Sequence, residues 1–149
     1  MTLRWLLASL HLLALGIGLG AIFVRARSLG NARATRDLRP VFLADNLWAA
    51  AGALWLGTGL WRAFGGIEKG AAYYLGHPLF HAKLGLFLAI LVLEVWPIVA
   101  LVRWRIALRG GGSPDLGRAP RLARLSYLQL ALLVPIPFLA AAIARGIGA

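Results

Sequence analysis

The sequence predicts an all-α protein, an antiparallel up-and-down bundle of four transmembrane helices that forms one domain over residues 1–149. Hydrophobic residues make up 60% of the chain, and the mean hydropathy of +0.78 is too high for an ordinary soluble domain. The apolar residues gather in four runs, each about the ~20 residues that a helix needs to cross ~30 Å of hydrocarbon. The charged residues, only 14% of the chain, cluster mainly between these runs.

The four runs are expected to be helices because a lipid-embedded segment must satisfy its own backbone hydrogen bonds. Their expected bounds are residues 5–24, 41–61, 79–102 and 125–144. A cleaved signal peptide is the alternative for the first run. No small-residue cleavage site follows Val24, which favours a membrane helix instead.

The connections contain recognisable start and stop signals. The first helix is expected to continue past its apolar run and to break near Gly30, and Pro40 suits the first turn of the second helix. Glu68–Lys69 is expected to be a solvated pair in the short second connection. Pro78 is expected to restart the chain as the third helix, and residues 109–120 read as a flexible Gly/Pro loop.

The basic residues predict the orientation in the membrane. Cytoplasmic connections carry an excess of Lys and Arg, and eleven arginines lie in the first and third connections against four basic residues at the opposite ends. We therefore expect both termini on the non-cytoplasmic side of a bacterial inner membrane. The eleven are Arg25, Arg27, Arg33, Arg36, Arg39, Arg103, Arg105, Arg109, Arg118, Arg121 and Arg124, and the four are Arg4, Arg62, Lys69 and Arg145.

Polar residues at helical spacing predict a charged layer in the cytoplasmic half of the bundle. Polar side chains in a membrane bundle normally face other helices. With alternating helix directions, the expected inner layer combines two carboxylates, an amide and two arginines: Asp45, Glu94, Gln129, Arg25 and Arg103. One interpretation is proton uptake or acid–base chemistry by the carboxylates, and the other is simple charge pairing with Arg25, Arg103 or Arg105.

A second polar layer is expected in the outer half, around His11, Lys83 and Arg62. A buried membrane histidine can be a structural hydrogen-bonding group, a haem-iron ligand or a proton relay, and all three remain open for His11. His81 is a second candidate ligand. It lies two residues from Lys83, about 200° around a helix, so it faces outward if Lys83 faces inward.

Glycines at small-xxx-small spacing predict close helix contacts. Gly16 and Gly20 form such a pair in the first helix, and Gly52 and Gly59 are similarly placed in the second. The alternative is that these glycines leave room for a flat cofactor.

Composition excludes several classes of protein. The chain has no cysteine, which removes disulfides and thiolate metal sites, and its single methionine argues against copper(I) transport. The net charge of +11 does not indicate nucleic acid binding, because the arginines flank runs of bilayer length. Membrane lipid and a homo-oligomer or a larger membrane complex are the expected partners.

Five short motifs resemble a bacterial family of predicted membrane proteins of unknown function. They are Asp45–Trp48 (DNLW), Thr58–Arg62 (TGLWR), Phe80–Leu84 (FHAKL), Leu93–Pro97 (LEVWP) and Arg103–Arg105 (RWR). The resemblance covers nearly the whole chain. It implies four helices in the inner membrane and no assigned activity.

A looser resemblance is to the HemJ-type protoporphyrinogen oxidases and to copper-resistance-D membrane domains. HemJ-type proteins pair a first-helix histidine in a Leu-His context with a third-helix lysine in a Lys-Leu context, and His11 and Lys83 match these positions. The resemblance implies haem b and tetrapyrrole oxidation. The Trp-x-x-Gly-Leu and Leu-Pro-Arg segments that follow the histidine there are replaced here.

Three functional hypotheses follow. The first is a haem- or porphyrin-binding redox protein, with His11 as the axial metal ligand or substrate base and Lys83 holding an anionic propionate. The second is a non-catalytic subunit or assembly factor, whose arginine-rich loops contact anionic lipid or a partner. The third is a bundle that conducts protons or small solutes through Asp45 and Glu94.

Overall fold

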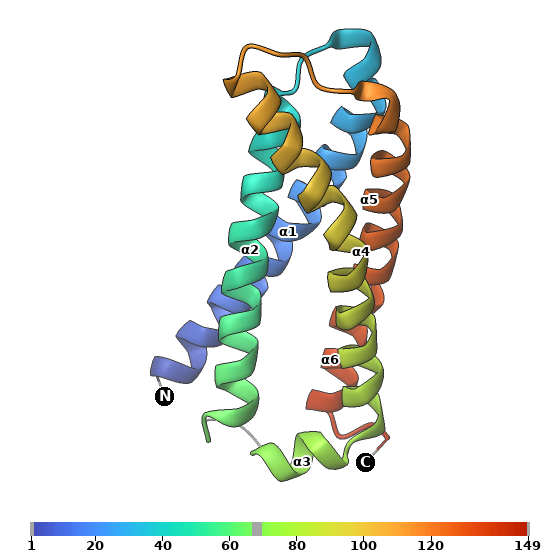
Figure 1. Ribbon diagram of the computed structural model, residues 1–149. Helices are drawn as coiled ribbons and strands as arrows, with labels where there is room; N and C mark the ends of the chain where they lie inside the picture. Colours follow the sequence, from blue (N-terminus) through green and yellow to red (C-terminus); the bar gives the residue numbers. More distant parts are fainter. Residues whose placement is uncertain (1, 67–69, 149) are drawn as a thin grey trace.

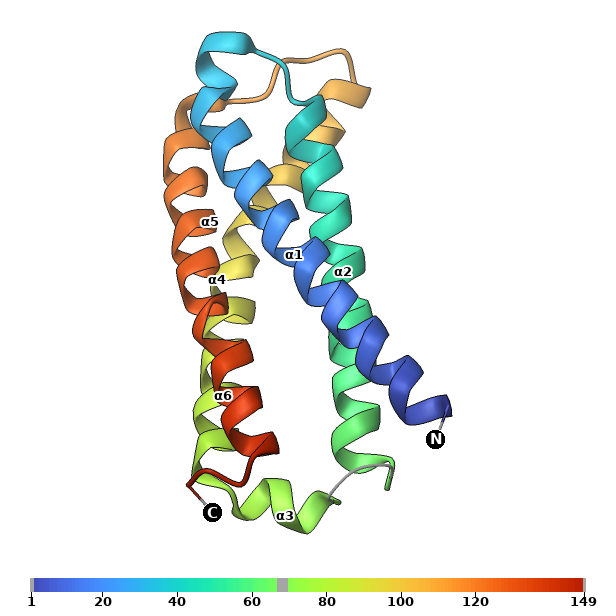
Figure 2. The same ribbon diagram turned by 180° about the vertical axis from the view of Figure 1, so that it is seen from behind.

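The computed structural model describes residues 2–66 and 70–148, and within these ranges the only regular secondary structure is helical. Glu68–Lys69, expected to be a solvated pair, lies outside them. Both ends of the bundle are clear in Figures 1 and 2: the α1–α2 and α4–α5 connections lie at one end, which we call the connection end, and both termini and α3 lie at the other, the termini end. The elements are α1 (Thr2–Thr35), α2 (Arg39–Phe64), α3 (Ala71–Gly76), α4 (Pro78–Arg109), η1 (Leu116–Arg118), α5 (Ala119–Leu133) and α6 (Pro135–Ala144).

Three helical segments in the described part of the chain are long and apolar enough to cross a membrane: α1, α4 and the run Leu116–Ala144. The 26-residue helix α2 is not among them. Its length of about 39 Å, at ~1.5 Å per residue, is sufficient to cross a membrane. Helix α2 is less apolar than the other three segments, because Asp45, Asn46, three glycines and three tryptophans lower its mean hydropathy.

Helix α1 is longer than predicted. The break expected near Gly30 is absent, and the helix continues to Thr35. Leu29 and Ala32, on either side of the glycine, are fully buried in the hydrophobic core at the connection end, and this packing outweighs the low helix propensity of glycine. The chain leaves the helix at Arg36, whose φ of 55° lies in the left-handed region.

The last predicted helix is two helices. Instead of one helix over 125–144, α5 begins at Ala119, and the run is interrupted at Val134 before α6. Pro135 and Pro137 have no backbone N–H, so the helical hydrogen bonds to Ala131 and Leu133 cannot form there. The prolines at the starts of α2 and α4 are where the sequence placed them, whereas the short helix α3 was not predicted.

Helix α1 is the centre of the packing. It contacts α2 and α5 more extensively than any other helices contact each other, and α4 packs on α5 and α6. The backbones of α2 and α4 are further apart, so the order around the bundle is α2, α1, α5–α6, α4, and side chains such as Arg105 bridge the side between α2 and α4 (Figure 1). The bundle is therefore closed by close helix packing on three sides and is more open on the fourth.

Gly18 is the glycine of α1 that faces α2, whereas the predicted Gly16 and Gly20 do not. A Cβ atom on Gly18 would lie 3.6 Å from the Trp48 ring and 3.8 Å from Ala51, whereas one on Gly16, Gly20 or Gly52 would meet nothing within 4 Å. The small-xxx-small interpretation of Gly16 and Gly20 is thus wrong, because both face away from the neighbouring helices.

A substitution pair tests this contact. Gly18→Leu would force the Trp48 ring or the helices apart, and we expect it to destabilise the protein by about 1–3 kcal/mol. Gly16→Leu is the matched control and is expected to be nearly neutral. Thermal unfolding in detergent measures both, and equal melting temperatures for the two variants would contradict the assignment.

Candidate functional site

Arg25 lies at the centre of a charged cluster that joins four helices. Its side chain is completely buried, and its guanidinium contacts residues from α2, α4 and α5. The shortest contacts are to Glu94, with Nη1 2.6 Å from Oε1 and Nη2 2.7 Å from Oε2. This two-point pairing is the strongest geometry available to an arginine and a carboxylate.

Every N–H of the Arg25 guanidinium has an acceptor. Nη1 also donates to Asp45 Oδ1 at 3.0 Å, Nη2 to Gln129 Oε1 at 2.9 Å, and Nε to Ser126 Oγ at 3.2 Å. A guanidinium has five donors, and five contacts are present. Gln129 completes the arrangement by donating to Glu94 Oε2 at 2.6 Å and to the Ile90 carbonyl at 3.2 Å.

Arg105 completes the charge balance of the cluster. Its Nη2 lies 2.9 Å from Asp45 Oδ2 and 2.9 Å from Asn46 Oδ1, and its guanidinium lies 4.9 Å from the centre of the Phe42 ring. Two arginines therefore face two carboxylates. The prediction that Arg103 joins this layer is corrected, since Arg103 is exposed. Residues 103 and 105 are about 200° apart on a helix, so only one of them can face α2.

The cluster is built to hold helices together. Of the five residues predicted for the inner layer, Arg25, Asp45, Glu94 and Gln129 meet, and each carboxylate is bonded to an arginine. Buried charges in a membrane bundle are costly unless they are paired in this way. The geometry thus agrees with the charge-pairing interpretation of Asp45 and Glu94.

His11 is buried on α1 at the other end of the bundle. Its Nδ1 lies 2.9 Å from the Thr58 hydroxyl of α2, and that hydroxyl lies 2.7 Å from the Leu54 carbonyl. A hydroxyl has one proton, and the carbonyl can only accept it. Thr58 therefore donates to Leu54 and accepts from His11, which assigns the ring proton to Nδ1. The other ring nitrogen, Nε2, is left with a free lone pair.

Trp55 of α2 covers one face of the His11 ring. The two rings stack with centroids 5.1 Å apart and an interplanar angle of 16°, and a Cβ on Gly59 would lie 3.1 Å from His11 Cε1. Lys83 Nζ lies 5.7 Å from the centre of the same Trp55 ring. Trp55 is itself buried, and its indole N–H has no hydrogen-bond partner within the described residues. A buried donor without a partner marks a place where an acceptor is missing.

A cavity of about 360 Å³ lies beside these side chains. His11, Trp55, Arg62 and Lys83 all line it, together with apolar residues of α1, α2, α4 and α6. None of its described lining residues is a carboxylate. The wall thus combines an imidazole with two cationic side chains, which suits a ligand that carries negative charge.

His81 does not belong to this cavity. It is exposed, and its Nε2 lies 2.8 Å from the Leu75 carbonyl in the segment that precedes α4. Its prediction as a second cofactor ligand is corrected, because it lies on the opposite side of α4 from Lys83. His77 is the buried histidine of that region. It packs against Tyr73, and neither ring nitrogen has a partner within the described residues.

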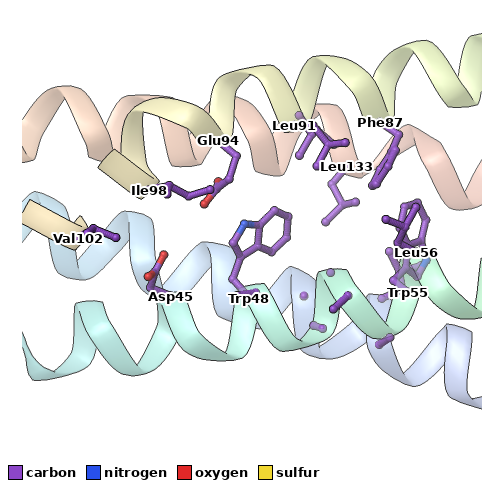
Figure 3. Close-up of a pocket in the computed structure, with 18 of the residues that line it drawn as sticks. Asp45, Trp48, Trp55, Leu56, Phe87, Leu91, Glu94, Ile98, Val102 and Leu133 are labelled. Carbon is purple, nitrogen blue, oxygen red and sulfur yellow. The ribbon is translucent and has the colours of Figure 1, made fainter. Parts of the chain in front are cut away.

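The open side between α2 and α4 is an apolar cleft of about 380 Å³. Figure 3 shows Asp45 and Glu94 at one end of it, Trp48 between the helices, and Trp55 with Phe87 at the other end. Trp55 also lines the cavity around His11, so the cleft and that cavity adjoin at this side chain. The cleft therefore lies between the charged cluster and the histidine cavity.

Sequence reasoning missed three features of these sites. Thr58 carries the hydrogen bond that orients His11, and its signal was a polar residue three positions after Trp55, on the face that carries Gly52 and Gly59. Arg105 is one of three arginines that the sequence offers as carboxylate partners, but the predicted inner layer contained Arg103 in its place. His77 packs against Tyr73 of α3, a helix that the sequence did not predict, and lies near Gly148 beyond the end of α6.

The whole chain corresponds to one family. The family described as "Predicted membrane protein (DUF2214)" matches residues 3–148, so the chain belongs to it. No curated protein and no solved structure matches the chain significantly. The looser likeness to HemJ-type oxidases and copper-resistance-D domains thus gains no support from these comparisons.

Proposed function

We propose that this member of the DUF2214 family of predicted membrane proteins binds a cofactor of the haem class at the termini end, with His11 as the axial ligand. The observation that carries the proposal is the hydrogen bond from His11 Nδ1 to Thr58. Histidines that bind metals donate their second ring N–H to a protein acceptor, which fixes the ring and leaves the other nitrogen as the ligand atom. His11 is oriented in this way.

The surroundings of His11 support the same ligand class. Lys83 lies on the same cavity wall, where it suits an anionic propionate of a haem, and Arg62 lines that wall as well. The unpartnered Trp55 N–H offers a further donor. A volume of about 360 Å³ takes part of a tetrapyrrole, and the remainder fits the adjoining cleft. A bound haem would supply electron-transfer chemistry, while the chain binds it and orients it.

The absorption spectrum of purified protein tests the proposal. We expect protein isolated in mild detergent, from cells supplied with haem precursors, to show a Soret band and about one haem per chain. A colourless protein that contains neither iron nor porphyrin would overturn the proposal.

The open side between α2 and α4 supports a second candidate, a subunit of a larger membrane complex. Its cleft exposes apolar surface that a partner helix would cover. A partner protein that copurifies in a stoichiometric amount would support this role. We expect Gly52→Phe, in the cleft wall, to abolish this copurification and Gly16→Phe, outside the cleft, to leave it intact. If the wild-type chain purifies without any partner, this result would count against the role.

The placement in the membrane is part of the proposal. Together with the three apolar segments, α2 would make a fourth crossing of the bacterial inner membrane, with both termini outside and the arginine-rich connections in the cytoplasm. The cysteine-free chain allows a direct test. In intact cells, an impermeant maleimide should label Ala71→Cys but not Ser113→Cys, and the reverse pattern would refute this orientation.

A further inference from the structure

A basic groove at the connection end is independent of the histidine cavity. It has a volume of about 820 Å³ and is lined by residues of the α1–α2 and α4–α5 connections. These two connections lie at the same end of the bundle (Figure 1). Three exposed arginines, Arg33, Arg36 and Arg39, line it. None of the three forms an ion pair with a carboxylate of the described residues.

The two aspartates in the groove are engaged by the backbone. Asp37 Oδ1 accepts the Arg39 N–H at 3.0 Å, and Asp115 Oδ1 accepts the Gly117 N–H at 2.9 Å. Both carboxylates therefore shape the two connections and do not pair with the arginine side chains. The groove has three guanidiniums free to bind an anion.

Four apolar side chains also line the groove, and we call them its floor: Leu38, Phe42, Leu108 and Leu116. Leu38 belongs to the hydrophobic core at this end. A site that combines cations with hydrocarbon fits a ligand with an anionic head and an apolar body. Free phosphate shares the anionic head but has nothing to place on this floor.

The position of the groove along the bundle fits the same ligand. Helix α1 has 34 residues and is about 51 Å long at ~1.5 Å per residue, so it extends well beyond ~30 Å of hydrocarbon. Its last turns therefore lie at the depth of lipid headgroups. Basic pockets of this kind between membrane helices bind anionic headgroups.

We propose that the groove lined by Arg33, Arg36 and Arg39 is a binding site for an anionic phospholipid, with its phosphate on the guanidiniums and its acyl chains along the apolar floor. The backbone conformation of Arg36, at φ 55°, places this residue in the turn between α1 and α2 rather than on a further turn of helix. The site does not depend on any ligand at His11.

Lipid binding to the full chain in detergent, measured by native mass spectrometry with phosphatidylglycerol, tests the proposal. The variant carries Arg33→Gln, Arg36→Gln and Arg39→Gln, and its matched control carries Arg109→Gln, Arg121→Gln and Arg124→Gln. Both lose three charges, and the control positions are exposed and outside the groove. We expect the groove variant to lose at least about tenfold in affinity and the control to stay within about twofold.

Three results would overturn the proposal. An equal loss in both triple variants would mean that phosphatidylglycerol responds to overall charge and not to the groove. Displacement of the lipid by inorganic phosphate at similar concentration would mean that the site is a plain phosphate site. Binding of phosphatidylcholine as tight as that of phosphatidylglycerol would count against it as well, since the arginines would then contribute nothing.

Discussion

Arg25→Met is expected to destabilise the protein by about 3–5 kcal/mol, the largest effect of any single substitution in this chain. The arginine makes five hydrogen bonds to side chains of three other helices. Its removal leaves Glu94 buried without its cation and leaves Ser126 and Gln129 without their partner. The penalty arises mainly from the uncompensated charge, because methionine fills most of the same volume.

The free energy of unfolding in detergent, monitored by tryptophan fluorescence, measures this effect. Arg27→Met is the matched control, since Arg27 is exposed two residues further along the same helix. Removing both partners, as in Arg25→Met with Glu94→Met, is expected to cost less than the sum of the two single changes. Additive losses would show that the ion pair does not hold the helices, and a loss for Arg27→Met as large as for Arg25→Met would show the same.

His11→Ala is expected to abolish the Soret band while leaving most of the fold intact, the second large effect. The substitution removes the proposed ligand atom and one hydrogen bond to Thr58. Because Thr58 keeps its bond to the Leu54 carbonyl, α2 loses no backbone contact. Haem content per chain is the measurement, with the unfolding temperature recorded alongside it.

His81→Ala is the matched control for His11→Ala. It also removes an imidazole from the termini end, but His81 is exposed and bonded to the Leu75 carbonyl. We expect its haem content to equal that of the wild type. Equal haem loss in both variants, or full haem content in His11→Ala, would refute the assignment of His11.

The inward faces of the helices could be predicted from the sequence because membrane helices follow a regular period. His11, Gly18 and Arg25 lie seven residues apart on α1, and all three are buried. The same spacing placed Glu94 and Gln129 correctly on α4 and α5. Polar residues in an apolar helix have one low-energy direction, toward the other helices, so the pattern determines the face.

Contacts that depend on the relative rotation of helices could not be predicted. Arg103 and Arg105 are equally plausible partners of Asp45 in the sequence, and only the crossing of α4 over α2 brings Arg105 to it. The contact between Thr58 and His11 was missed for the same reason, because it depends on how α2 lies against α1.

Imidazole rescue of His11→Gly tests most directly whether His11 presents its free Nε2 to a ligand. The substitution leaves a space beside Trp55 and Gly59 where His11 stood. Added imidazole can occupy that space and supply the missing nitrogen. We predict that purified His11→Gly is colourless in the presence of haem alone and regains the wild-type Soret band when imidazole is added. A folded His11→Gly protein that binds haem equally well with and without imidazole, or never binds it, would contradict the claim.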